Sequence, residues 1–290
     1  MRKKNSDRAL AALLLLALLL CACPLEENRA GDDLLLADKA VEEQDVGDAE
    51  MYFLRYLRKN PDGKRRWDVW QQLLSIALNI RQDNATAKDY LEIMLVEFSG
   101  DPSRRRDIAM DLALLCRDMR FYTRAAELWE SLADDPDLGA EEKALAYREQ
   151  AYNYLRRLEF TPAAESLDLC LKLKAGPERM ADCYYALAET QLLNEDLKAS
   201  ETALRDLLMI EGLPEDRKSA AVFMLSEVLE MRDLPEESRL LLESIMQTYP
   251  NSKVIEVRLG ALKGKKSAAS PARSPRPGTE GRNPAPERRK

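Results

Sequence analysis

Histidine is absent from all 290 residues. Its absence removes the commonest general base and metal ligand, together with every Ser-His or Cys-His nucleophile pair. No two cysteines are separated by two residues, the spacing typical of zinc sites. Adjacent carboxylates such as Glu141 and Glu142 lie at turns or helix starts, where they complement the helix dipole. We therefore predict a protein that is not an enzyme and that holds no metal or cofactor. An envelope enzyme that uses carboxylates is the catalytic alternative.

Aromatic residues are scarce, at 6% of the chain, whereas apolar residues make up 46% and charged residues 33%. A disordered chain would lack the large apolar fraction, and a bundle of membrane helices would lack the large charged fraction. The abundance of Leu, Ala, Glu and Arg favours helices over strands. The net charge of −7 is unevenly spread: residues 21–262 carry −17, residues 1–20 carry +3 and residues 263–290 carry +7. An acidic body argues against nucleic acid as a partner, because phosphates are bound by clustered Lys and Arg.

The chain begins with a basic segment followed by an apolar run of twelve residues, Ala9 to Leu20. A helix of that length spans about 18 Å, which is short of the roughly 30 Å hydrocarbon core of a bilayer. A basic start followed by a short apolar stretch is typical of a secretion signal. We therefore assign residues 1–22 to a signal peptide.

The end of this segment resembles the lipobox of bacterial lipoproteins, with Leu20 at −3, Ala22 at −1 and Cys23 as the modified cysteine. The resemblance implies cleavage before Cys23 and attachment of a lipid to it, so that Cys23 tethers the protein to a membrane. Pro24 follows in place of the Asp that retains enteric lipoproteins in the inner membrane. We therefore expect the periplasmic face of the outer membrane. The alternative is an ordinary signal peptide with a chance cysteine.

Residues 31–262 contain a pattern that recurs six times with a period near 38. Each copy has a small residue, a second small residue twelve positions later, a large apolar residue four further on and an apolar residue three beyond that. The first small positions are Ala37, Ser75, Ala113, Ala151, Ala188 and Ser226. The second are Ala49, Ala87, Ala125, Ala163, Ser200 and Ser238. The apolar positions are Phe53, Leu91, Trp129, Leu167, Leu204 and Leu242, then Tyr56, Met94, Leu132, Cys170, Leu207 and Ile245.

This pattern predicts paired helices. Two helices approach within about 8–10 Å only where the residues at their crossing are small, and large residues one turn away then fill the remaining volume. Gly and Pro at the repeat boundaries, such as Gly176-Pro177, end one pair and begin the next. Ile255, Leu259 and Leu262 continue the apolar spacing after the last pair and indicate a capping helix. The alternative is a helical bundle without repeats.

The fourth copy resembles the tetratricopeptide repeat (TPR) in its spacing of Ala151, Tyr154, Phe160, Ala163 and Leu167. The usual TPR period is about 34 residues, so the extra residues here must lengthen loops or helices. The resemblance implies an all-α, right-handed α-solenoid of about six TPR-like helix hairpins with a C-terminal capping helix. The first helix of the first hairpin, predicted over residues 32–43, is short and acidic.

The domain boundaries follow from these segments. Residues 1–22 form the lipoprotein signal peptide and residues 23–30 a tether. Residues 31–262 form the TPR-like solenoid, and residues 263–290 form a disordered basic tail rich in Pro, Ser and Arg. The tail is either simply solvated or contacts an anionic polymer or lipid of the envelope.

The remaining cysteines have two interpretations. Cys116 and Cys170 fall at core-facing positions, so they are predicted to be small buried hydrophobes. A disulfide between Cys170 and Cys183 is the alternative in an oxidising periplasm.

In the TPR family the first helix of each pair lines a groove that binds peptides. Carried over by repeat phase, the middle repeats would present Met110, Arg117, Arg148, Tyr152, Arg156, Tyr185, Glu189 and Phe223. Arg148, Tyr152 and Arg156 are four apart and share one helix face, and Arg and Tyr are enriched at binding hot spots. A solvated helix face is the alternative for the same residues.

The function expected from these features is a non-enzymatic, lipid-anchored periplasmic scaffold that binds envelope proteins or peptides. Similarity to TPR lipoproteins of the envelope suggests a part in outer-membrane protein assembly. The alternative is an adaptor that associates with peptidoglycan through the basic tail.

The repeat phase is testable by stability measurements. Ala163→Leu should overpack a helix crossing and lower the free energy of unfolding by about 1–3 kcal/mol. Glu165→Ala, two residues away on the predicted outer face, should leave it nearly unchanged. Urea denaturation of both variants compares them directly, and equal effects would show that the phase is wrong.

Overall fold

The computed structural model describes residues 23–268, with side chains described for residues 32–262. All regular secondary structure in this part of the chain is helical. The chain divides into two compact units at Leu173 and Lys174. Within 23–268, no helix is long and apolar enough to cross a membrane.

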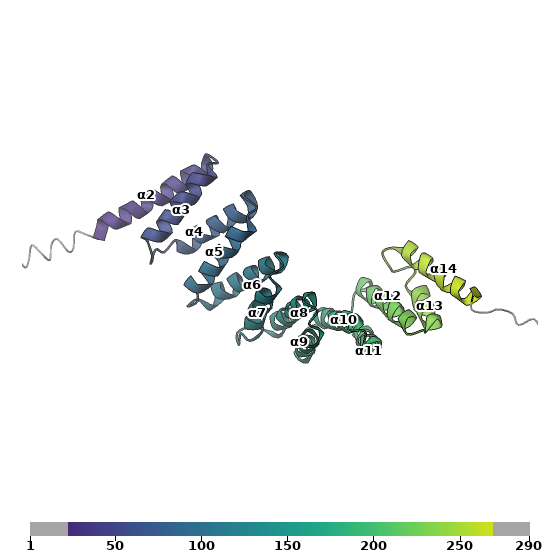
Figure 1. Cartoon of the computed structure of the whole chain (residues 1–290). Helices are drawn as coiled ribbons and strands as arrows, with labels where there is room; N and C mark the ends of the chain where they lie inside the picture. The colour runs from purple at the N-terminus through teal and green to yellow at the C-terminus, as the bar shows by residue number, and fades with distance from the viewer. Residues whose placement is uncertain (1–22, 269–290) are drawn as a thin grey trace, which may run out of the picture. The chain divides into compact units, whose positions relative to one another are not determined.

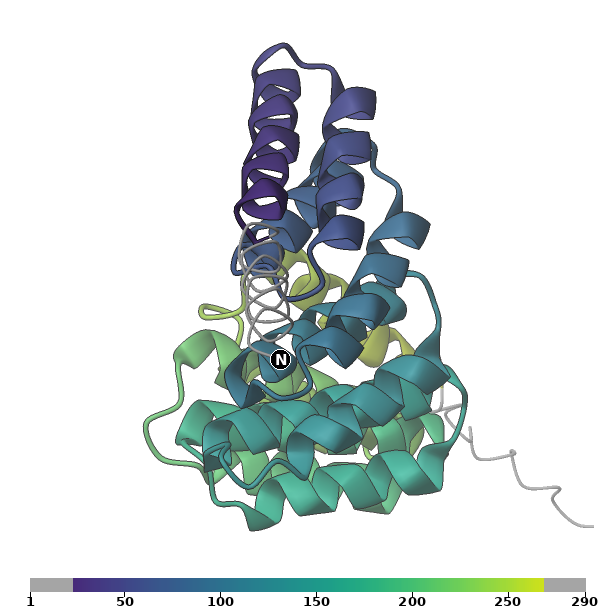
Figure 2. The same ribbon diagram turned by 90° about the vertical axis from the view of Figure 1, so that its left-hand side faces the viewer.

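The first unit is a run of antiparallel helix pairs (Figures 1 and 2). Each helix packs on its neighbour in the chain, as α2 does on α3 and α7 on α8. The helices are α2 (Cys23–Glu42), α3 (Val46–Lys59), α4 (Arg66–Ser75), η1 (Ile76–Ile80), α5 (Asn84–Glu97), α6 (Pro102–Asp118), α7 (Tyr122–Ala133), α8 (Ala140–Arg156) and α9 (Phe160–Lys172).

The second unit contains two further pairs and a terminal helix. Here α11 packs on both α10 and α12, and α13 packs on both α12 and α14. The helices are α10 (Pro177–Leu193), α11 (Leu197–Leu208), α12 (Glu215–Met231), α13 (Pro235–Ser244) and α14 (Ser252–Ala268). Together the units contain the six predicted hairpins and the predicted capping helix.

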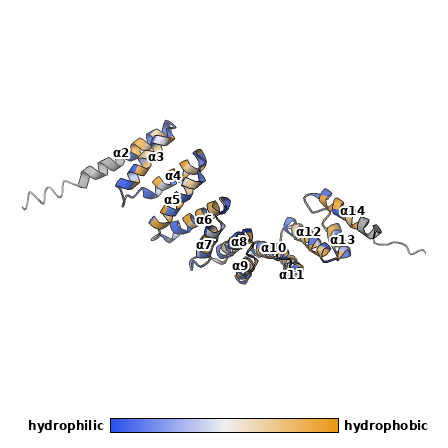
Figure 3. Cartoon of the chain, in the orientation of Figure 1, coloured by the Kyte–Doolittle hydropathy of each residue, from blue (hydrophilic) through white to orange (hydrophobic). Residues whose placement is uncertain are grey.

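The second helix of every pair buries its three predicted columns. The small residues Ala49, Ala87, Ala125, Ala163, Ser200 and Ser238 are each 0% exposed. The twelve large or apolar residues of the other two columns are all buried as well. Orange and blue alternate along the helices in Figure 3, as expected of amphipathic helices that turn one face to a core.

One hydrogen bond joins the two small columns directly. The Ser200 hydroxyl on α11 donates to the Ala188 carbonyl oxygen on α10, with 2.8 Å between the atoms. This contact requires the two backbones to approach closely at the predicted crossing. It also satisfies a hydroxyl that is otherwise removed from water.

Ser75 is the one column member that was predicted wrongly. It is exposed, and Leu74 is buried in its place, 39 rather than 38 residues before Ala113. The cause is the π-helical turn η1, where the Arg81 amide bonds the Ile76 carbonyl five residues back. A π turn accommodates one more residue than an α turn, so the residues before it are displaced by one position.

Each pair turns between its helices through a residue in the left-handed region. These residues are Gln44, Gln82, Arg120, Leu158, Glu195 and Asp233, with φ between 52° and 65°. Their spacing of 38, 38, 38, 37 and 38 equals the spacing of the sequence repeat. In most of them the next amide bonds a carbonyl five residues back, as from Glu159 to Tyr154, which is the Schellman arrangement. The backbone therefore shows the repeat independently of burial.

The first hairpin is held by a buried carboxylate. Asp33 on α2 accepts hydrogen bonds from Arg55 Nε at 2.8 Å and Lys59 Nζ at 3.1 Å, both on α3. Burial alone would raise the pKa of Asp33, but hydrogen bonds and charge from the two cations outweigh it, so the pKa lies below its ordinary value. The acidic first helix is therefore joined to its partner by ion pairs as well as by Ala37 and Ala40.

Two boundaries differ from those drawn on the sequence. The predicted tether, residues 23–30, is helical and forms the start of α2. The capping helix α14 continues to Ala268, six residues into the predicted tail. Residues 1–22 and 269–290, and the side chain of Cys23, lie outside the description, so the signal peptide, the lipid attachment and most of the tail remain predictions.

One of the three remaining cysteines is a small buried residue, as predicted, and the other two are in disulfides. Cys116 is a free, buried thiol whose pKa is raised by burial. Cys170 and Cys183 are each disulfide-bonded, so the interpretation of Cys170 as only a small buried hydrophobe is incomplete.

The left-handed turns generate a stability prediction. Leu158 has φ of 61° and is 73% exposed, so its side chain strains the turn and buries little. Leu158→Gly should raise the free energy of unfolding by about 0.5–1 kcal/mol, because relief of the Cβ clash outweighs the added freedom of the unfolded chain. Leu169→Gly, at an exposed site inside α9, should lower it by about 1 kcal/mol. Urea denaturation of the two variants measures the sign of each change in the free energy of unfolding. A lower free energy of unfolding for Leu158→Gly would refute the left-handed turn geometry.

Candidate binding surfaces

The eight predicted groove residues fall in both units. The first unit holds Met110 and Arg117 on α6, and Arg148, Tyr152 and Arg156 on α8. The second holds Tyr185 and Glu189 on α10, and Phe223 on α12. Each group is positioned by the first helix of its hairpin, as the repeat phase predicted.

Glu149 joins the two first helices α6 and α8. It is only 7% exposed, and its carboxylate accepts hydrogen bonds from Arg117 Nη1 at 3.1 Å and from Arg148 Nη2 at 2.5 Å. Burial would lower the pKa of Arg117, but the carboxylates of Asp118 and Glu149 outweigh it and raise the pKa. Glu149 therefore holds both guanidinium groups in one place.

Tyr152 and Arg156 continue this face of α8. Tyr152 is 44% exposed, and the Arg156 guanidinium carbon lies 5.8 Å from the ring centroid of Tyr122, the first residue of α7. The Tyr122 hydroxyl is the main cause of a raised pKa at Arg156. We define the helix-face surface as Arg117, Arg148, Glu149, Tyr152 and Arg156.

The other predicted residues are less available. Met110 is half-buried and packs against the core of the first unit. The Phe223 ring stacks on Tyr249 with centroids 4.8 Å apart, and the Arg258 guanidinium lies 4.8 Å from the Phe223 centroid. Tyr185 and Glu189 are exposed, and burial together with nearby acidic charge raises the pKa of Tyr185.

Sequence reasoning missed Glu149, which is the centre of the helix-face surface. In the sequence, Glu149 is visible only as a carboxylate next to Arg148. Its ion pair with Arg117, 32 residues earlier, can be found only when the packing of α6 against α8 is known.

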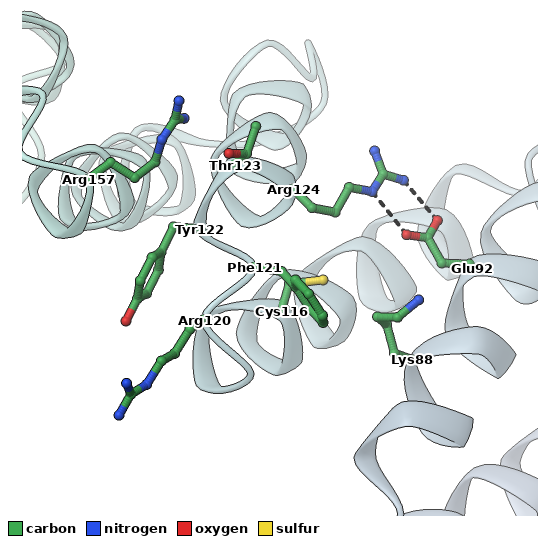
Figure 4. Close-up of a pocket in the computed structure, with 9 residues that line it drawn as sticks. All are labelled: Lys88, Glu92, Cys116, Arg120, Phe121, Tyr122, Thr123, Arg124 and Arg157. Carbon is green, nitrogen blue, oxygen red and sulfur yellow. Dashed lines mark hydrogen bonds and ion pairs between the residues drawn. The ribbon is translucent and has the colours of Figure 1, made fainter.

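Sequence reasoning also missed a hollow of about 500 Å³ in the first unit. The hollow contains none of the eight predicted residues. It is lined by Lys88, Glu92, Cys116, Arg120, Phe121, Tyr122, Thr123, Arg124 and Arg157 (Figure 4).

Neither surface is arranged for the chemistry of a metal. Among the described residues, no three His, Cys, Asp or Glu side chains come close enough to hold an ion. What the surfaces offer is oriented guanidinium groups beside aromatic rings, which suits recognition of polar and acidic groups.

No protein-family profile and no curated protein sequence matches this chain. Solved structures do match it. The C-terminal part of a TPR repeat-containing protein from Cytophaga hutchinsonii has a TM-score of 0.57 at 15% identity and covers 88% of this chain and 96% of its own. PilW, described as a widely conserved type IV pilus biogenesis factor, has a TM-score of 0.51 at 13% identity and covers 79% of this chain and 98% of its own.

These similarities, at low identity, establish the fold alone. The chain has an all-α fold of TPR-like helix hairpins, as its sequence predicted. They do not by themselves establish a partner, because one fold hosts many functions.

Proposed function

We propose that this protein is a non-enzymatic scaffold of the bacterial cell envelope that binds a protein partner. The observation that carries the proposal is the helix-face surface in the third and fourth repeats. There Glu149 fixes Arg117 and Arg148 beside the exposed ring of Tyr152. Preoriented arginine and tyrosine side chains on a packed helical frame are suited to anchor a polypeptide.

The place of action is proposed from the sequence. Leu20, Ala22 and Cys23 resemble a lipobox, and a lipid on Cys23 would hold the helix pairs close to a membrane. One acyl chain anchors a protein only marginally, whereas two or more hold it firmly. We place the protein on the periplasmic face of the outer membrane. The description of PilW as a pilus biogenesis factor makes assembly of an envelope structure a process to test, alongside assembly of outer-membrane proteins.

The proposal is tested by photo-crosslinking in cells. A photoreactive amino acid at Tyr152 should give a discrete crosslink to an envelope protein. The same amino acid at Leu169, an exposed position on α9, should not. Arg148→Glu combined with Arg156→Glu should abolish the crosslink, because it reverses the charge on both sides of Tyr152. Cys23→Ala in the same cells should move the chain from the membrane fraction to the soluble fraction.

The outcomes separate the two parts of the proposal. Equal crosslinking from Tyr152 and Leu169, or crosslinking that survives the double charge reversal, would contradict the helix-face surface as the binding site. A native chain that fractionates as soluble, or a Cys23→Ala chain that stays with the membrane, would contradict the lipid anchor.

A further inference from the structure

The hollow in the first unit is built from three consecutive repeats. Lys88 and Glu92 come from α5, Cys116 from the end of α6, and Arg157 from the residue after α8. Residues 120–124 come from the turn between α6 and α7 and from the start of α7. Its volume of about 500 Å³ lies within the range of ligand pockets. It lies at the turn ends of the helix pairs and shares none of the residues of the helix-face surface.

The residue before the second helix differs between the pairs, and Phe121 occupies this position in the third pair. In three other pairs the residue before the second helix is an aspartate, Asp45, Asp83 or Asp196, whose side chain accepts a bond from an amide of the first turn. Phe121 occupies this position before α7, makes no such bond and is 48% exposed. Glu159 before α9 and Leu234 before α13 also make no cap bond, so three of the six pairs start their second helix without one. Phe121 is distinguished by an aromatic ring that is exposed without a visible gain in packing, and such local inconsistencies concentrate at functional sites.

Four cations, Lys88, Arg120, Arg124 and Arg157, line the hollow with one carboxylate, Glu92, and three of the four cations are paired. Arg124 is bound by Glu92, with 3.0 Å and 2.9 Å between the paired atoms, and by Glu127 at 3.3 Å. Lys88 pairs with Asp89 at 2.8 Å, and Arg157 pairs with Glu159 at 2.8 Å.

Arg120 differs from these three cations. Within the described part of the chain it has no ion pair, and its side chain is exposed. In Figure 4 the ring of Phe121 lies between Arg120 and Tyr122 on one side and Lys88 and Glu92 on the other. In the same view the Arg120 side chain extends away from the Phe121 ring, on the side of Tyr122, so an available guanidinium and an available aromatic ring occupy separate points of the lining.

We propose that this hollow is a second binding site, which takes a segment of a partner protein containing carboxylates and a large apolar side chain. The apolar side chain packs on Phe121 above the buried, neutral thiol of Cys116. A neighbouring carboxylate bonds Arg120. Arginine binds carboxylates with two parallel hydrogen bonds, and aromatic residues with arginine are the usual anchors of such contacts. A bare phosphate would leave Phe121 unused, so an acidic peptide matches the lining better.

The inference rests on the proposed function only in taking a protein as the ligand. Tyr122 lies between the two sites, since it lines the hollow and its ring also faces Arg156. A partner that binds along α6 and α8 would therefore pass close to the hollow.

The test uses the full chain purified in detergent and a fluorescent synthetic peptide of alternating Glu and Phe. Fluorescence anisotropy should show binding that weakens as salt is raised. Arg120→Glu and Phe121→Asp should each raise the Kd at least about tenfold, a change of 1.4 kcal/mol. Phe121→Asp restores the aspartate cap seen at three other turns, so it should keep or raise the thermal midpoint. Its loss of binding could then not be attributed to unfolding.

Matched controls separate the outcomes. Arg58→Glu, an equal charge change at an exposed site on α3, should leave the Kd within about twofold of the native value. Peptides with Gln for Glu or Ala for Phe should bind more weakly. No binding of the Glu-Phe peptide at millimolar concentration, native affinity in both hollow variants, or full displacement by inorganic phosphate would each overturn the proposal. Crosslinking from Tyr152 would still stand in those cases.

Discussion

Close contact between the two helices of each pair, at an alanine or serine on the second helix, is the constraint on which the rest of this structure depends. All six of these residues are fully buried, and in the fifth pair a hydrogen bond from Ser200 to the Ala188 backbone spans the crossing. Only small side chains allow backbones to approach this closely. The large residues one turn further, such as Trp129 and Leu167, then fill the space that the close approach leaves between successive pairs.

The binding surfaces follow from this frame because they are built across repeats. Arg117 and Arg148 meet at Glu149 only because α6 and α8 belong to neighbouring pairs. The hollow requires α5, the turn before α7 and the end of α8 together. Positions in the buried columns maintain the stacking, whereas positions outside them, such as Phe121 and Tyr152, differ between repeats without disturbing it. In the function proposed here, specificity would therefore lie in the residues that do not repeat.

The sequence predicted the frame well and the surfaces incompletely, for physical reasons. Small and large residues at fixed spacing report burial directly, so the hairpins and their columns were predictable. Ser75 was misplaced because a π turn shifts the phase by one residue, and no residue pattern near Ile76 announces it. The left-handed turn residues were missed because none of them is glycine, the usual signal. Glu149 and the hollow were missed because they depend on contacts between residues about thirty positions apart.

Residue-resolved hydrogen exchange in the native state tests the helix-crossing constraint most directly. In a stack of repeats, stability is shared mainly between nearest neighbours. Replacing Ala125 by Leu should therefore reduce protection of the amides in α6, α7 and α8, while α2 and α3 keep theirs, and Glu127→Ala should reduce none. Unchanged protection in α6 to α8 after Ala125→Leu would contradict close helix contact at the small residues as the basis of the fold.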